Sequence, residues 1–282
     1  MKKIFLIILS LLWSAALYAQ GDAITVCHTS STEKFAIFAS NENFNNEHQM
    51  PRFYIHVSEE GGKMIRFKTP NGQEASGYLL EAKNKTSNWI IVFQEWWGLN
   101  DNIKRESEAF YKDLGNVNVI ALDMYDGKVA TDRETAGRYM QEFKQERGDA
   151  IIKGALNYAG KDAKVGTIGW CFGGGQSLLA SLIAGNQAAA CVIYYGMPVD
   201  DVAKLKTLKA DVLGIFAIKD QWINPQAVKK FEENMKAAGK NLTVKNYNAD
   251  HGFSNPSNTI FDKEATEDAY KTTLAFFKAR LK

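Results

Sequence analysis

The chain has 282 residues, of which 45% are hydrophobic and 12% aromatic. This length and composition are ordinary for a globular protein, with enough apolar residues for one large domain or two small ones. The 34 basic and 32 acidic residues nearly cancel, to a formal charge of +2. Composition therefore gives no case for nucleic acid or an acidic membrane surface as a partner.

The first 19 residues have the three parts of a secretory signal peptide. Lys2 and Lys3 precede an apolar run from Ile4 to about Trp13, and small residues follow up to Ala19. The apolar part is shorter than the roughly 20 residues of a membrane span. We expect cleavage after this region and export to the periplasm or the medium, with no membrane partner afterwards. An uncleaved anchor is the alternative.

Residues 20–61 are polar, rich in asparagine and irregular in pattern. Such a stretch has too few apolar residues for an independent core. We therefore predict an extension that packs on the main domain. The predicted organisation is a signal peptide at 1–19, this extension at 20–61 and one catalytic domain at 62–282.

From Lys63 onward, strand and helix patterns alternate. The first two strands, "KMIRFKT" and "ASGYLLEA", are joined by an Asn-Gly turn and predict a hairpin. Further strands are predicted at 89–94, 117–123, 164–170, 188–195, 211–218 and 242–247. Helices are predicted at 101–114, 131–146, 149–160, 174–185, 225–239 and 264–281. This order predicts an α/β fold, a mixed and mostly parallel doubly wound sheet with helices on both faces.

Ligands of an open parallel sheet bind beyond the carboxyl ends of its strands. Glu95, Cys171, Asp220 and His251 each follow a predicted strand closely. A carboxylate, a thiol, a second acid and an imidazole are therefore expected at one edge of the sheet.

Cys171 lies in "GWCFGGG", between a predicted strand and a predicted helix. A nucleophile on such a sharp turn needs small flanking residues, which glycine provides. The N-terminus of the following helix favours a thiolate. The alternative is a tight turn in which the cysteine is merely small.

His251 follows the last predicted strand and can serve as the base for Cys171. Asp220 can accept the Nδ1–H of His251 and fix its tautomer. Asp250 is a second choice for this acid. If Asp220 were only a helix-cap residue, Asn224 would be the better candidate for that cap.

The remaining cysteines and histidines give little sign of a metal. Cys27 has no local clue to its role, and Cys191 lies in an apolar strand pattern that predicts a buried, inert thiol. With three cysteines, at least one thiol is free or pairs between chains, and the pattern does not decide whether Cys27 or Cys191 forms a disulfide. The four histidines are scattered, so no metal is predicted. No motif for an organic cofactor is present either.

Several motifs together carry a family resemblance. "QEWWGLN", "ALDMYDGK", "GWCFGGG", "AIKDQWINP" and "DHGFSNP" occur in order between about residue 63 and the C-terminus. In this set the chain resembles the dienelactone hydrolases, a branch of the α/β-hydrolase fold. The resemblance implies that Cys171 is the nucleophile, His251 the base and Asp220 its orienting acid. It further implies that Glu95 contacts and helps to activate the resting thiol.

The resemblance also places an oxyanion hole at the backbone N–H groups of Trp96 and Phe172. The chain departs from the family where two arginines hold the substrate carboxylate. Those arginines would fall near Gly127 and at Asn255, so the natural substrate stays open. Lys128 offers only a point charge in their place. The predicted substrate pocket consists of Trp97, Tyr125, Lys128, Trp222, Phe253 and Asn255.

These features predict an exported hydrolase that cleaves a small-molecule ester or lactone through a thioester at Cys171. We expect a monomer or a small homo-oligomer. One alternative is a catalytically silent protein that binds a small apolar ligand on the same fold. Another is a redox-responsive thiol protein.

Overall fold

The structure is a computed structural model, and it describes residues 30–282. The predicted signal peptide, the first part of the predicted extension and Cys27 lie outside the described residues.

An eight-stranded sheet forms the centre of the protein, with the strand order β1-β2-β4-β3-β5-β6-β7-β8. The first two strands form the predicted antiparallel hairpin, and β2 also pairs antiparallel with β4. All other neighbours are parallel. The predicted mixed, mostly parallel sheet is confirmed. The strands are β1 (Lys63–Lys68), β2 (Glu74–Leu80), β3 (Asn88–Phe93), β4 (Asn118–Leu122), β5 (Lys164–Trp170), β6 (Ala188–Tyr194), β7 (Asp211–Ala217) and β8 (Leu242–Tyr247).

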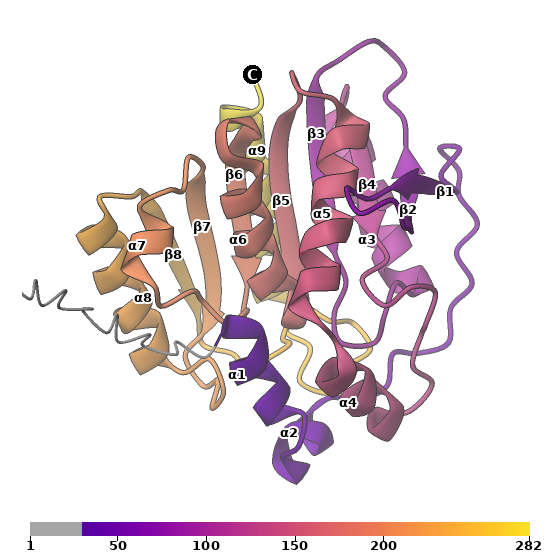
Figure 1. Ribbon diagram of the computed structural model, residues 1–282. Helices are drawn as coiled ribbons and strands as arrows, with labels where there is room; N and C mark the ends of the chain where they lie inside the picture. The colour runs from indigo at the N-terminus through magenta and orange to yellow at the C-terminus, as the bar shows by residue number, and fades with distance from the viewer. Residues whose placement is uncertain (1–29) are drawn as a thin grey trace, which may run out of the picture.

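Helices cover both faces of the sheet, with α5 and α6 in front and α3 and α9 behind in the view of Figure 1. The central strands are almost fully buried because both of their faces are covered. The helices after β3 are α3 (Asp101–Leu114), α4 (Arg133–Glu142), α5 (Gln145–Ala159), α6 (Phe172–Ala184), α7 (Val202–Leu205), α8 (Pro225–Ala238) and α9 (Lys263–Arg280), with a 3₁₀ turn, η1, at Gly185–Gln187.

One predicted helix, 131–146, is shorter in the structure. Helix α4 ends at Glu142 because Phe143 takes an extended conformation. The Phe143 ring then lies 5.0 Å from the ring of Phe172, next to the predicted nucleophile. This tertiary contact overrides the local helical pattern.

The predicted cap at Asn224 is confirmed, since its side chain accepts the N–H of Ala227 at the start of α8.

The prediction of an irregular stretch is wrong for part of residues 30–61. Two helices are present, α1 (Ser31–Phe38) and α2 (Glu42–Glu47). Ser30 and Glu33 form a reciprocal capping box at α1, and the side chain of Asn41 caps α2. Both helices lie across the lower edge of the sheet in Figure 1, where β5 ends and α6 begins. Helix α1 contacts α4 and α6, and α2 contacts α4.

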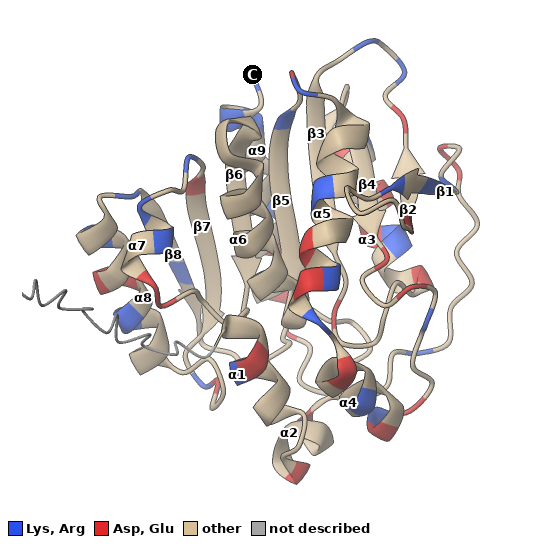
Figure 2. Cartoon of the chain, viewed as in Figure 1, with Lys and Arg blue, Asp and Glu red and all other residues tan. Residues whose placement is uncertain are grey.

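Charged residues of both signs are interspersed over the surface, and α6 carries none (Figure 2). The charge-free sequence of α6 agrees with its burial against β5 and β6. Within residues 30–282, none of the helices combines the length and apolar character that crossing a membrane requires.

Candidate active site

Cys171 occupies a strained turn between β5 and α6. Its backbone angles are φ 59° and ψ −119°, outside the regions that residues other than glycine ordinarily adopt. The Cys171 N–H donates to the carbonyl of Tyr194 at 3.0 Å, which holds the turn against β6. A non-glycine residue in such a conformation is typical of a functional site and of a nucleophile turn.

The glycines around Cys171 are required by close backbone contacts. A Cβ on Gly169 would lie 2.1 Å from the carbonyl oxygen of Gly173. A Cβ on Gly173 would in turn lie 2.4 Å from the carbonyl oxygen of Gln94. Both distances are too short for a real Cβ atom. The turn can therefore form only with glycine at these two positions.

Cys171, His251 and Asp220 form a hydrogen-bonded chain. The Sγ of Cys171 lies 3.4 Å from Nε2 of His251, and Nδ1 of His251 lies 2.7 Å from Oδ2 of Asp220. The other oxygen of Asp220 accepts the backbone N–H groups of Trp222 and Ile223 at 2.7 and 2.8 Å. Asp220 is thereby fixed, and it fixes the imidazole of His251 in turn. All three side chains are buried.

Burial and charge act in opposite directions on these groups. Burial raises the pKa of Asp220, but the His251 charge and the hydrogen bonds outweigh it, so that the pKa is lowered. For His251 burial has the opposite effect and lowers the pKa. The charges of Asp220 and Cys171 and the hydrogen bonds to them outweigh burial and raise the pKa of His251 well above its usual value. For Cys171 burial dominates, and the pKa of the thiol is raised despite the neighbouring imidazole. In this enclosed state burial therefore outweighs the helix N-terminus that the sequence predicts to favour a thiolate.

A second histidine, His48, contacts the thiol from the other side. Its Nε2 lies 3.7 Å from Sγ of Cys171, and its Nδ1 lies 2.7 Å from the backbone oxygen of Phe44. Because that oxygen can only accept, Nδ1 carries the proton and Nε2 presents a lone pair to the sulfur. Burial lowers the pKa of His48 from 6.5 to about 3, and the charge of His251 adds to this effect. His48 is therefore a neutral imidazole at ordinary pH.

Aromatic rings from α2 and two loops enclose the thiol. The ring of Phe44 lies 5.4 Å from Trp96 and 5.2 Å from Trp222. The ring of His48 lies 4.9 Å from Trp96. Only 1% of Cys171 is exposed. In this conformation the segment of α1 and α2 covers the predicted nucleophile.

Glu95 lies near this chain of residues but is bonded elsewhere. Its Oε2 accepts the side-chain amide of Asn255 at 2.9 Å. Within the described residues Glu95 makes no hydrogen bond to Cys171, although its charge acts on the thiol and raises the pKa of Cys171. Burial raises the pKa of Glu95 to about 7, although the His251 charge and the Asn255 amide act against it.

The two backbone N–H groups of the predicted oxyanion hole lie on either side of Cys171 in the fold. Phe172 is the first residue of α6, and Trp96 follows β3, the strand that pairs with β5. Within residues 30–282 the N–H of Trp96 has no hydrogen-bond acceptor. It is available to a ligand oxygen.

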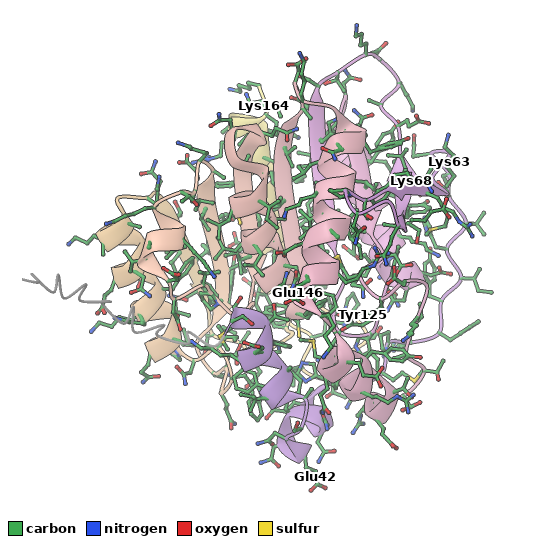
Figure 3. The ribbon with its side chains drawn as sticks, viewed as in Figure 1. Glu42, Lys63, Lys68, Tyr125, Glu146 and Lys164 are labelled. Carbon is green, nitrogen blue, oxygen red and sulfur yellow. The ribbon has the colours of Figure 1, made fainter. Side chains whose placement is uncertain are left out.

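The predicted pocket residues are divided among several places. Asn255 lines a cavity beside Glu95 that contains about 490 Å³, part of it open to solvent. Tyr125 and Lys128 line a different cavity of about 560 Å³. Figure 3 places Tyr125 at the lower end of α5, near α4.

The other three pocket residues line neither of these cavities. Trp222 lies over Phe44, and its Nε1–H donates to Glu47 at 2.6 Å. Trp97 is buried against Trp96, with ring centroids 5.1 Å apart. Phe253 is fully buried between the rings of Tyr195 and Tyr247, and its role in the substrate pocket stays a prediction. Its aromatic character serves the core.

Cys191 is a buried free thiol, as its strand pattern predicts. Its sulfur lies 3.6 Å from the hydroxyl of Ser177. Among the described residues it makes no hydrogen bond to Cys171, His48 or His251 and forms no disulfide.

His48 is the residue of this site that the sequence did not predict. A signal for its helix exists, because Ser30 and Glu33 have capping-box spacing and Asn41 is a typical N-cap residue. That signal predicts the helices but not where they pack. The other site residues are predicted because each follows a strand, whereas His48 follows none.

Comparison with known proteins gives a family. The model of the dienelactone hydrolase family matches residues 75–281. The protein called usf from Aquifex pyrophilus is 30% identical over 237 residues, which cover 78% of this chain and 99% of that protein. A carboxymethylenebutenolidase from Pseudomonas putida is 26% identical over 66% of this chain and 84% of its own length. A solved dienelactone hydrolase-like promiscuous phosphotriesterase from metagenomic libraries superposes with a TM-score of 0.67 at 19% identity, over 78% of this chain and 99% of that one.

The fold and the site thus define an α/β-hydrolase, and the chain belongs to the dienelactone hydrolase family. This membership confirms the resemblance and the prediction of an enzyme of the carboxylic ester and lactone hydrolase class.

Proposed function

We propose that this protein hydrolyses a small carboxylic ester or lactone through a thioester on Cys171. The observation that carries the proposal is the bonded chain from Sγ of Cys171 through His251 to Asp220. Family membership supports the reaction class. The carboxymethylenebutenolidase relative supports an ester or lactone as the substrate.

In the first half of the reaction, Sγ of Cys171 attacks the carbonyl carbon while His251 accepts the thiol proton at Nε2. The tetrahedral oxyanion is bound by the backbone N–H groups of Trp96 and Phe172. When the carbon–oxygen bond breaks, His251 returns the proton to the leaving oxygen, and the acyl group stays on sulfur. Asp220 stabilises the imidazolium throughout.

In the second half, a water molecule gives a proton to His251 as its oxygen attacks the thioester. The carbon–sulfur bond breaks, the acid product leaves and Cys171 regains its proton. This cycle consumes one water and requires no cofactor. Glu95 lies beside the cavity that Asn255 also lines, where a substrate can approach. We propose that the charge of Glu95 acts on a substrate that approaches through this cavity.

The purified protein should hydrolyse small activated esters and lactones, and Cys171→Ala should lose that activity. Cys191→Ala is the matched control, because this second free cysteine is buried away from His251. Equal rates for the wild type and Cys171→Ala would refute the proposal, and the absence of hydrolysis in both would favour a silent binding protein. A panel of substrates with and without a free carboxylate would define specificity, since Gly127 and Asn255 stand where the family has arginines.

We further propose that the protein is exported with cleavage after Ala19. The pattern of residues 1–19 supports this proposal. N-terminal sequencing of the protein recovered from the periplasm or medium tests it. A mature chain that still begins at Met1 in the cytoplasm would contradict it.

A further inference from the structure

Three side chains at this site offer metal-ligand atoms in one small volume. The Nε2 atoms of His48 and His251 and the Sγ of Cys171 all lie within 4.8 Å of one another, and all three residues are buried. The proposed reaction uses Cys171 and His251. It gives no role to His48.

The two sulfur–nitrogen distances match those of a tetrahedral zinc site. With Zn–S near 2.3 Å and Zn–N near 2.0–2.1 Å, tetrahedral angles separate sulfur and nitrogen ligands by roughly 3.6 Å. Here Sγ of Cys171 lies 3.4 Å from Nε2 of His251 and 3.7 Å from Nε2 of His48. The two Nε2 atoms lie within 4.8 Å of each other, and they would approach to about 3.3 Å when both bind one ion.

The groups behind the two histidines favour the same interpretation. Metal-binding histidines almost always donate their second ring N–H to a carboxylate or a backbone carbonyl. Nδ1 of His251 lies 2.7 Å from Asp220, and Nδ1 of His48 lies 2.7 Å from the carbonyl of Phe44. Both Nε2 atoms therefore face the thiol and can act as ligands.

We propose that His48, Cys171 and His251 bind Zn²⁺ reversibly, with a fourth position open to water. One thiolate and two imidazoles are a donor set that suits zinc. Binding forms one Zn–S and two Zn–N bonds and releases one proton from the Cys171–His251 pair. The sulfur lone pair is then held by the metal, so the zinc form does not attack a carbonyl carbon. His48, which follows α2, thus adds a third ligand to the catalytic pair of Cys171 and His251.

Zinc affinity of the full chain, measured by competition with a chromophoric chelator, tests this proposal directly. We expect one Zn²⁺ per chain, with His48→Gln and Cys171→Ala each weakening the affinity by at least about 100-fold. His56→Gln is the matched histidine control, since His56 is bonded to Glu108 at 2.9 Å. Cys191→Ala is the matched cysteine control. Neither control should change the affinity.

Co²⁺ in place of Zn²⁺ gives a spectroscopic readout that does not depend on turnover. The wild type should show the absorption of tetrahedral cobalt with a thiolate charge-transfer band, and Cys171→Ala should lose that band. Zn²⁺ should also protect Cys171 from iodoacetamide in the wild type but not in His48→Gln, as followed by peptide mass spectrometry. Circular dichroism of each variant checks that it is folded.

Several results would overturn the metal site. One is a zinc affinity of His48→Gln equal to that of the wild type, which would leave only the catalytic pair as ligands. Another is loss of binding in a Cys27→Ser, His28→Gln variant, which would place the metal elsewhere. Zinc binding by a protein that hydrolyses no ester after a chelator has removed the zinc would refute the proposed function alone. Hydrolysis by a protein that binds no zinc would refute this inference alone.

Discussion

Two histidines flank the same thiol in different environments. His251 comes from the loop after β8 and is bonded to a buried carboxylate, which raises its pKa. His48 follows α2 and is bonded to a backbone carbonyl, and burial lowers its pKa to about 3. The partner at Nδ1 thus decides the chemistry that Nε2 offers to Cys171. A carboxylate supports proton transfer, whereas a carbonyl only fixes a neutral ligand.

The largest expected effect separates the two histidines in catalysis. His251→Gln should lower kcat by roughly 10²–10⁴-fold, the usual contribution of a general base. His48→Gln should lower it much less, because an imidazole with so low a pKa is a poor base. Steady-state kinetics on an activated ester measures both. Equal losses in the two variants would break the comparison.

The next effect concerns the packing that holds His48 over the thiol. Phe44 is fully buried against Trp96 and Trp222. Phe44→Ala should weaken the docking of α2 by up to about 3–5 kcal/mol, the usual cost of a buried phenylalanine. Cys171 should then react faster with iodoacetamide. Ile37→Ala, which changes an exposed residue of α1, is the control and should leave the rate unchanged.

A smaller effect appears in the pH dependence of stability. His48 has a pKa of about 3 when folded and 6.5 when unfolded. Its stabilising contribution is therefore present above pH 6.5 and is lost as the pH falls toward 3. The loss approaches roughly 1.4 kcal/mol per pH unit in this window. Denaturant unfolding of the wild type and His48→Gln at pH 7.0 and about 5.5 measures the difference. A difference that does not change with pH would contradict a buried neutral His48.

The smallest effect involves Glu95, which is coupled to the charge of His251. Its pKa of about 7 in the folded state exceeds the ordinary value of 4.5. The protonated form is therefore favoured by folding, and that stability is lost as the pH rises through about 7. Glu95→Gln should gain stability relative to the wild type as the pH is raised through this value, whereas the exposed Glu232→Gln should not. Thermal unfolding across this pH range checks the sign.

Much of the fold follows from local sequence patterns. The Asn-Gly turn after Lys68 and the apolar strand runs predicted the hairpin and the parallel sheet, which are confirmed. The sequence predicts a break between the helices at 131–146 and 149–160, but its position at Phe143 was not predictable locally, because it depends on the contact of Phe143 with Phe172. The sequence predicts the aromatic ring of Phe253 in the pocket, and the structure buries this ring between Tyr195 and Tyr247. A residue type alone does not say whether its ring faces a ligand or the core.

Local sequence patterns are enough to predict that Cys171, Asp220 and His251 lie at one edge of the sheet. A topological rule places such residues, because the carboxyl ends of parallel strands share one edge. The position of His48, 123 residues before Cys171 in the chain, depends instead on long-range packing. Its helix packs by long-range burial of Phe44 among tryptophans, which no local pattern encodes. The same packing closes the site around the thiol.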